Sequence, residues 1–294
     1  MRSFWGFIPA LALGLVTTVT AAEPANSADE LKKKAEANWE TVGAGKAALH
    51  ETKHFVVCAP EAMARRLKDV GNLLEKHHDK AKEALKFDIP EEAKGEVLPG
   101  RVTVYLFAER EHFTAFVRRI ESRRFLPEET GSYSARDDKL HVAASPPRGK
   151  QGLPVEIQAC EQVASLLLAR RAGVRTPLPD WVTAGFGRAT YYRVAPRDKA
   201  VLADRGLAAN LSRKRGISDV WDGKIAADEA DAMQGSLMDF LAYGPAARVF
   251  PKFIAGFAPE ENMEKKTAGQ AFEAADLKPD KVAKSWKAWA PIAR

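Results

Sequence analysis

The sequence predicts an α+β fold in which a small mixed sheet is followed by an all-helical C-terminal part. Two observations predict this class. Short segments rich in valine and aromatic residues, such as residues 101–107, alternate in the first half of the chain as strands do. Beyond residue 155, apolar residues instead recur at spacings of three and four, which is the pattern of helices that bury one face.

Residues 1–22 have the pattern of a secretory signal, because Arg2 precedes an apolar run from Phe4 to Val16 and small residues follow that run. No later stretch reaches roughly 18 apolar residues without a charge, so we expect no transmembrane anchor. The mature chain is therefore predicted to be secreted or periplasmic. Residues 23–49 are predicted to form an N-terminal extension that is first disordered and then helical.

The chain has 294 residues and a formal net charge of +6. This mild basic excess includes four short clusters, at residues 32–34, 118–119, 123–124 and 213–215. Such clusters fit contact with an acidic polymer or an anionic surface, although solvated helix faces and loops have the same composition. No pattern of a nucleic-acid-binding module accompanies them, so no specific nucleic-acid partner is expected.

An α+β domain is predicted over residues 50–193. Alternating or β-branched segments predict its strands, and helical periodicity predicts its helices. The turn-rich segment A-R-D-D-K between two short strands predicts a hairpin. In chain order, the expected elements are a strand at 54–58, a helix at 61–86, a strand at 101–107, a helix around 113–120, a hairpin at 132–144, and helices at 155–172 and 180–193.

The remaining residues, 194–294, are predicted to form a helical subdomain. Their apolar residues recur at helical spacing in three runs. These runs are Met233-Leu237-Phe240-Leu241, Phe250-Phe253-Ile254-Phe257 and Val282-Trp286-Trp289.

His77 lies on the apolar stripe of the helix at 61–86, so it is either a buried core histidine or a ligand or acid–base group. No carboxylate or cysteine pattern accompanies it, and the core interpretation is preferred. The next residue, His78, is expected to face outward.

Two segments of the helical region resemble the core of the thermolysin-like (gluzincin) zinc peptidases. Residues 160–164 read C-E-Q-V-A where those enzymes carry H-E-x-x-H, and residues 178–187 read L-P-D-W-V-T-A-G-F-G where they carry a W-x-x-E-G-x-A-type segment. In this register, Cys160 stands at the first histidine, Ala164 at the second, and Ala184 at the glutamate ligand. The resemblance implies a zincin-type core helix packed on the small sheet, in a bacterial exported peptidase-like protein.

The same resemblance gives roles to three further residues. Glu161 stands at the general-base glutamate, as a vestige of that base, although a helix glutamate can also point to solvent or pair with an arginine. Trp181 and Tyr133 are expected beside the cleft. In the family, an edge strand like the one containing Tyr133 binds extended substrate by strand addition, so a peptide could be held without being cleaved. The other interpretation is a capping hairpin with a charged edge.

A catalytic zinc site needs three protein ligands with nitrogen, sulfur or oxygen donors and one open position. Ala164 and Ala184, which occupy two of the three positions, have no lone pair to offer. Without a metal ion nothing lowers the pKa of the attacking water, so Glu161 would have no activated nucleophile. No histidine follows His141, so no shifted H-E-x-x-H exists in this half. We therefore expect no metal, no cofactor and negligible peptidase activity.

The leading hypothesis is an exported, catalytically inactive peptidase-like protein that binds a polypeptide or a cell-envelope component in the old cleft. An alternative is a metal-free or residual hydrolase that uses Cys160 or Glu161, with His54, His112 or His141 brought near by folding. A third hypothesis is a basic surface protein that binds acidic polysaccharide or lipid.

The two cysteines, Cys58 and Cys160, allow one disulfide bridge in an oxidising compartment. A bridge would require their Cα atoms to come within about 7 Å of each other. The preferred alternative is that each cysteine is a small buried apolar group.

Overall fold

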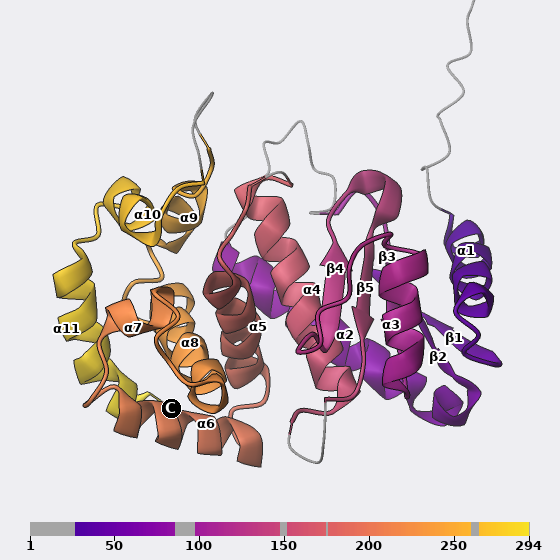
Figure 1. The fold of residues 1–294 in the computed structure, drawn as a ribbon, viewed down its shortest axis with the longest axis horizontal. Coiled ribbons are helices and arrows are strands. Elements are labelled where there is room, and N and C mark those ends of the chain that lie inside the picture. Colours follow the sequence, from indigo (N-terminus) through magenta and orange to yellow (C-terminus); the bar gives the residue numbers. More distant parts are fainter. Residues whose placement is uncertain (1–26, 86–97, 148–151, 175, 260–264, 294) are drawn as a thin grey trace, which may run out of the picture.

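The computed structural model describes residues 27–85, 98–147, 152–174, 176–259 and 265–293. The expected signal at 1–22 lies outside the described residues, as does the start of the predicted extension. The described part is a mixed α+β structure, in which a five-stranded sheet lies beside a large helical part (Figure 1). The fold class predicted from the sequence is confirmed.

Five strands form one mixed sheet in the spatial order β1-β2-β3-β5-β4. The central strands β2, β3 and β5 run parallel, while β1 and β4 are antiparallel edge strands. The central strands are almost wholly buried, as expected for strands covered on both faces. The strands are β1 (Ala47–Glu51), β2 (Phe55–Pro60), β3 (Val102–Leu106), β4 (Gly131–Ser134) and β5 (His141–Ala144).

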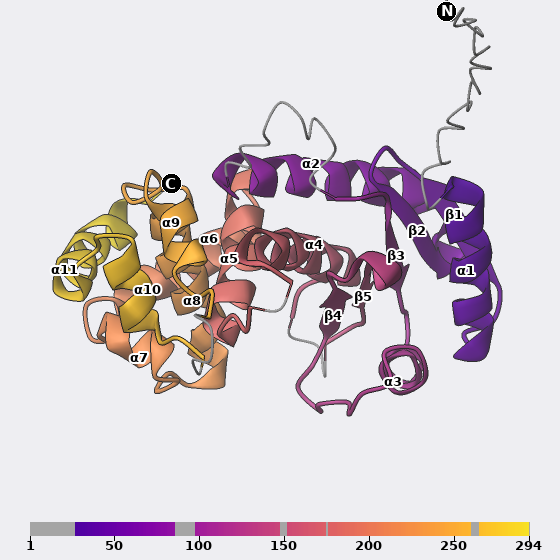
Figure 2. The ribbon, with the colours of Figure 1, turned by 90° about the horizontal axis from the view of Figure 1, so that it is seen from above.

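Helices cover both faces of the sheet (Figure 2). One face carries α2 (Leu67–Leu85) and α4 (Val155–Ala172), and the other carries α1 (Ala28–Thr41) and α3 (Arg110–Arg119). Side chains alternate along a strand, so neighbouring residues of β2 belong to different apolar clusters. Val57 packs toward α2 and α4, whereas Cys58 packs toward α1 and α3.

The helix α1 and the strand β1 belong to the folded domain rather than to an extension. β1 crosses the predicted boundary between residues 49 and 50 and pairs along its whole length with β2. On α1, the buried ring of Trp39 stacks on Phe107 with the ring centroids 5.0 Å apart. Burying a side chain of this size stabilises the docking of α1 by roughly 2 kcal/mol or more. Residues from Ala28 onward therefore pack with the elements that follow residue 50.

Cys58 and Cys160 are both free and both buried. Cys58 faces α1 and α3, whereas Cys160, on α4, belongs to the apolar cluster on the opposite face of the sheet. Because the sheet lies between the two sulfur atoms, the bridge considered from the sequence does not form. The preferred alternative, two small buried apolar side chains, is confirmed.

The C-terminal part contains helices and no strand among its described residues, as predicted. At its centre, α5 (Asp180–Val194) packs against α8 (Ala227–Ala242). Phe186, Leu237 and Trp286 belong to the same apolar cluster as α2 and α4, so one core continues past residue 194. The other helices are α6 (Lys199–Leu211), α7 (Ile217–Trp221), α9 (Phe250–Ala255), α10 (Ala268–Ala274) and α11 (Pro279–Trp289). None of the described helices combines the length and the apolar character that a membrane crossing requires.

Two glycines of α5 let three helices approach one another closely. A Cβ atom on Gly185 would lie 2.7 Å from the backbone oxygen of Gln234 on α8. A Cβ atom on Gly187 would lie 2.8 Å from the backbone oxygen of Glu161 on α4. Both distances are shorter than carbon–oxygen contact allows, so the segment G-F-G serves helix packing.

We expect Gly185→Ala and Gly187→Ala to lower the free energy of unfolding by about 1–3 kcal/mol, because overpacking outweighs the better helix propensity of alanine. The matched control is Gly206→Ala on α6, where a Cβ atom would meet no atom within 4 Å. That control should raise the free energy of unfolding by about 0.5–1 kcal/mol. Urea denaturation of the three variants measures these changes, and equal stabilisation by all three would contradict the close packing of α5.

Candidate functional site

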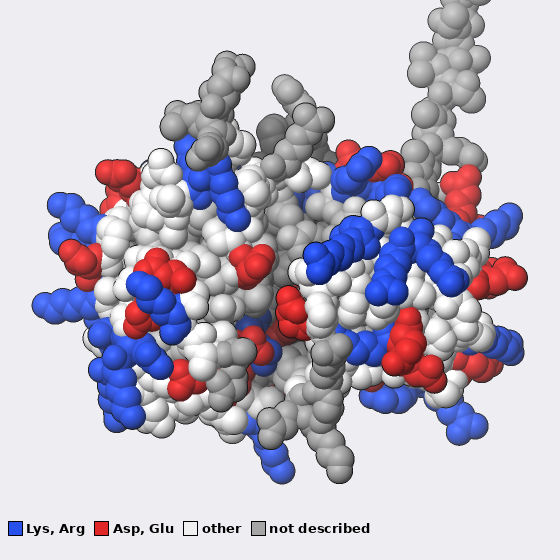
Figure 3. Space-filling model, viewed as in Figure 1, with Lys and Arg blue, Asp and Glu red and all other residues white. Residues whose placement is uncertain are grey.

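An open cavity of about 580 Å³ is bordered by α4, α5, α6, α8 and the segment that leads into β4. We call it the cleft. Figure 3 shows a hollow between the two halves of the molecule, with acidic side chains on its walls. The cleft therefore lies where the sheet-bearing part meets the helical part.

One polar face of α4 lines the cleft. Its members lie at spacings of three and four and are Gln158, Glu161, Gln162 and Ser165. The Ser165 hydroxyl lies 3.0 Å from the backbone oxygen of Thr183, to which it donates a hydrogen bond. The Gln162 side chain packs beside Gly131 of β4. This face of α4 therefore connects the cleft to the edge strand of the sheet.

Cys160 and Ala164 lie on a different face of α4 and are fully buried in the core. Consecutive residues of a helix are rotated by about 100°, so the face at positions 160 and 164 is turned away from the face at 161 and 165. The i, i+1 and i+4 positions that face the cleft are Glu161, Gln162 and Ser165.

The other site residues expected from the sequence are dispersed. Ala184 lines the cleft together with Glu161. Trp181 is buried against Phe253, with ring centroids 6.3 Å apart, and does not line the cleft. Tyr133 packs against the core and does not line it either.

Arg188, which the sequence analysis did not single out, lies at the centre of the cleft wall. Its Nε atom is 2.8 Å from Glu161 Oε1, its Nη1 atom 3.0 Å from Asp204 Oδ2, and its Nη2 atom 2.9 Å from Asp231 Oδ2. The contact with Glu161 is an ion pair without an aligned hydrogen bond. The Arg188 side chain is only 12% exposed, so water screens its pairs with Glu161 and Asp204 weakly, whereas its pair with the exposed Asp231 is screened more strongly. Arg188 follows Ala184 by one helical turn, and this spacing could have indicated it.

Burial governs the protonation of this network. It raises the pKa of Glu161 to about 7, while Arg188 acts to lower that pKa. Burial likewise raises the pKa of Asp204. Burial acts to lower the pKa of Arg188, but the three carboxylates raise it, so the guanidinium is a permanent cation. Glu161 is therefore the cleft carboxyl that titrates near neutral pH.

The cleft residues do not fit a catalytic zinc ion. The described lining contains neither histidine nor cysteine, and Glu161 is already paired with a guanidinium. Cys160 is a poor substitute nucleophile, because burial raises the pKa of its thiol well above the ordinary value and keeps the thiol protonated.

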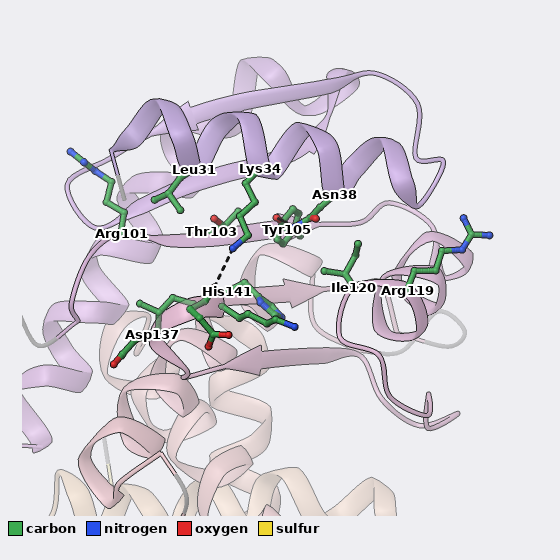
Figure 4. Close-up of a pocket in the computed structure, with 13 residues that line it drawn as sticks. Leu31, Lys34, Asn38, Arg101, Thr103, Tyr105, Arg119, Ile120, Asp137 and His141 are labelled. Atoms are coloured by element: carbon green, nitrogen blue, oxygen red, sulfur yellow. Dashed lines mark hydrogen bonds between the residues drawn. The ribbon is translucent and has the colours of Figure 1, made fainter. Parts of the chain in front are cut away.

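A second pocket, of about 240 Å³, lies between α1 and the sheet (Figure 4). On its sheet side, the hydroxyl of Tyr105 accepts a hydrogen bond from Asn38 Nδ2 at 2.8 Å. Lys34 Nζ reaches across to the backbone oxygen of Asp138 at 3.2 Å. The side chains of Arg101 and Arg119 border this pocket but point away from it. The pocket is thus small, polar at its mouth and without a concentrated charge.

Three potential metal ligands gather at the start of β2. One donor atom each of His54, Glu75 and His78 lies within 4.8 Å of the others. Both oxygens of Glu75 are already used, because Oε1 accepts from the His54 backbone N–H at 2.8 Å and Oε2 lies 2.6 Å from His54 Nδ1. The rings of His54 and His78 stack with an interplanar angle of 24°, so their in-plane lone pairs do not converge. We interpret the cluster as a polar connection between β2 and α2.

Of the two neighbouring histidines of α2, His77 is buried as predicted, but His78 does not face outward as predicted. His77 is fully buried beside Tyr191, which confirms the core interpretation, and burial lowers its pKa to about 3. His78 was expected to face outward, but it is 2% exposed beneath the ring of His54. The prediction was wrong because α2 is covered by β2 as well as by the helices, which buries a wider arc than its apolar stripe.

No protein-family model matches this chain, and no curated protein matches it either. The resemblance to the thermolysin-like peptidases therefore stays a prediction from the sequence. The function of the cleft is inferred from its geometry and charge.

We expect Glu161→Gln to flatten the dependence of stability on pH. A carboxyl whose pKa rises from 4.5 to about 7 on folding binds more protons in the native state, so its contribution is present at low pH and is lost as pH rises through 7. Between about pH 5 and about pH 8 the wild type should lose up to about 3 kcal/mol more than the variant. Thermal unfolding across this range measures the difference, and parallel profiles would contradict the burial of Glu161.

We expect Glu75→Gln to lower the free energy of unfolding by about 1.5–3 kcal/mol, because charge-assisted hydrogen bonds to His54 and Thr52 are lost. Glu109→Gln, at the exposed pair with His112, is the matched control and should change it by less than about 0.5 kcal/mol. A chelator should leave the wild-type melting temperature unchanged. A rise in melting temperature with equimolar zinc would instead identify the cluster as a metal site.

Proposed function

We propose that this chain is an exported, catalytically inactive peptidase-like protein that captures an extended polypeptide segment in the cleft. The observation that carries the proposal is the open cavity of about 580 Å³, which is bordered by the polar face of α4 and by the segment leading into an edge strand. The predicted signal at 1–22 supports export.

The free edge of β4 offers backbone groups to an added strand. Within the described residues β4 pairs only with β5. The Ser145 N–H donates to the backbone oxygen of Thr130 at 2.9 Å, so Thr130 faces β5. Because backbone groups alternate between the two sides of an antiparallel strand, those of Gly131 and Tyr133 face outward. A polypeptide in the cleft can therefore extend the sheet through these groups.

Binding without hydrolysis is supported by the chemistry of the cleft. Glu161 is ion-paired with Arg188, and the described lining has no imidazole or thiolate that could act as a nucleophile or a base. A guanidinium has no vacant coordination position with which to polarise a carbonyl or activate water.

A second candidate function, binding of an acidic polysaccharide or lipid surface, is favoured by one observation. Figure 3 shows basic side chains gathered over the sheet-bearing part of the molecule. Arg118, Arg119 and Arg124 are exposed at the end of α3 and just beyond it, and Leu126 nearby is 46% exposed. A cavity of about 390 Å³ accompanies these residues and is lined by Arg110, Arg118 and Arg119 together with Glu111. We rank this candidate second because that cavity is smaller than the cleft and Arg110 already donates to the backbone oxygen of Pro127.

The test uses blocked, fluorescein-labelled hexapeptides of alternating threonine and valine with one variable central residue. We expect at least one of them to bind the mature protein saturably in fluorescence anisotropy and none to be cleaved. Gly131→Pro and Gly131→Ala both add a Cβ atom that displaces the Gln162 side chain, but only proline removes the outward N–H. The proline variant should therefore bind at least about tenfold more weakly than the alanine variant. Absence of binding by every peptide would contradict the proposal, and chelator-sensitive cleavage would replace it with an enzyme.

A further inference from the structure

We propose that the cleft selects a cationic side chain, lysine or arginine, in the polypeptide that it binds. This inference rests on the proposed function and adds the chemical class of the ligand. It follows from the charge that the described residues place around the cavity.

The cleft is strongly acidic although the chain is basic. Its described lining contains four carboxyl groups and one guanidinium, so the formal excess is three negative charges when Glu161 is ionised and two when it is protonated. The four are Glu128, Glu161, Asp204 and Asp231. The whole chain has a formal charge of +6, so the acidic cleft is a local feature that runs against the overall charge. A cavity lined by one sign of charge concentrates ligands of the opposite sign.

Arg188, the one cation in the described part of the lining, is not available to an anionic ligand. Each nitrogen of the Arg188 guanidinium already lies within 3.0 Å of a carboxylate oxygen. An incoming carboxylate would meet three like charges before it reached the guanidinium. Recognition of an acidic residue or of a peptide C-terminus at this position is therefore unfavourable.

Two carboxylates of the cleft, Asp204 and Asp231, each keep one oxygen atom for contact with a cationic ligand. Asp231 contacts Arg188 through Oδ2, and the structure shows no partner for its Oδ1 among the described residues. Asp204 likewise uses Oδ2 for both Arg188 and Tyr192. The Asp231 side chain is 63% exposed, whereas that of Asp204 is 22% exposed, so the two carboxylates lie at different depths of the cleft. An ammonium or guanidinium group can thus donate hydrogen bonds to carboxylate oxygens at both depths.

The test compares three of the hexapeptides described above, with lysine, glutamine or glutamate at the central position. The lysine peptide should bind the wild type about tenfold more tightly than the glutamine peptide, and the glutamate peptide should bind most weakly. Added salt should reduce this preference, because it screens the charges at the exposed end of the cleft. Non-specific attraction to a basic protein would give the opposite order, so the order itself is diagnostic.

Asp231→Asn should reduce the preference for lysine over glutamine to about threefold or less. The matched control is Asp276→Asn, an exposed residue between α10 and α11 whose positive φ of 58° asparagine also accepts. This control should keep the wild-type preference. Asp231→Lys should shift the preference toward glutamate.

The outcomes separate the inference from the function on which it rests. Equal affinity for the three peptides, with binding still weakened by Gly131→Pro, would overturn the cationic preference and leave capture of a polypeptide intact. A lysine preference that persists unchanged in both Asp231 variants would also overturn the inference, because the selectivity would then come from another surface. Absence of binding by all three peptides would overturn the proposed function itself.

Discussion

The ion pairs of Arg188 hold the cleft together. This side chain on α5 contacts Glu161 on α4, Asp204 on α6 and Asp231 on α8, so it joins four helices around one cavity. Removing such charges from water is unfavourable, and it is offset only because each nitrogen of the guanidinium meets a carboxylate. Loss of Arg188 would leave three carboxyl groups close together without a compensating positive charge. The relative positions of the four helices, and with them the shape of the cleft, therefore depend on this network.

The same network limits the chemistry of the cleft. A guanidinium supplies a permanent positive charge, but it accepts no lone pair, so it cannot replace a metal ion as a Lewis acid. The guanidinium also forms an ion pair with Glu161, the residue that the resemblance to zinc peptidases would make the general base. The described lining of the cleft contains four carboxyl groups but only one guanidinium. Such a cavity can attract a cation and hold a polypeptide, and these are the two properties on which the proposals rest.

Much of the fold could be predicted from residue patterns, because each pattern reports local burial. α4 begins and ends at the predicted residues, 155 and 172, and the predicted hairpin is formed by β4 and β5. β1 was missed because only one of its five residues is buried, so it lacks the alternation of a half-buried strand. The burial of His78 was missed for a related reason, since a helix covered by both a strand and other helices has little exposed surface.

The site was harder to predict because α4 is enclosed by the sheet, α2 and α5. Cys160 and Ala164 pack into the core, and the close approach of Gly187 to Glu161 orients the opposite side of the helix. The spacing of the polar residues Gln158, Glu161, Gln162 and Ser165 is the sequence signal that could have indicated the face of α4 that lines the cleft.

The charge of the cleft could not be predicted from any local pattern. The carboxylates that pair with Arg188 through its two Nη atoms lie 16 and 43 residues away along the chain. Each of these acidic residues belongs to a helix whose sequence gives no sign of the other, and they meet only because α6 and α8 pack beside α5. An acidic cleft in a basic protein is thus a property of its tertiary structure. For this reason the fold, rather than the composition, points to the sign of the ligand.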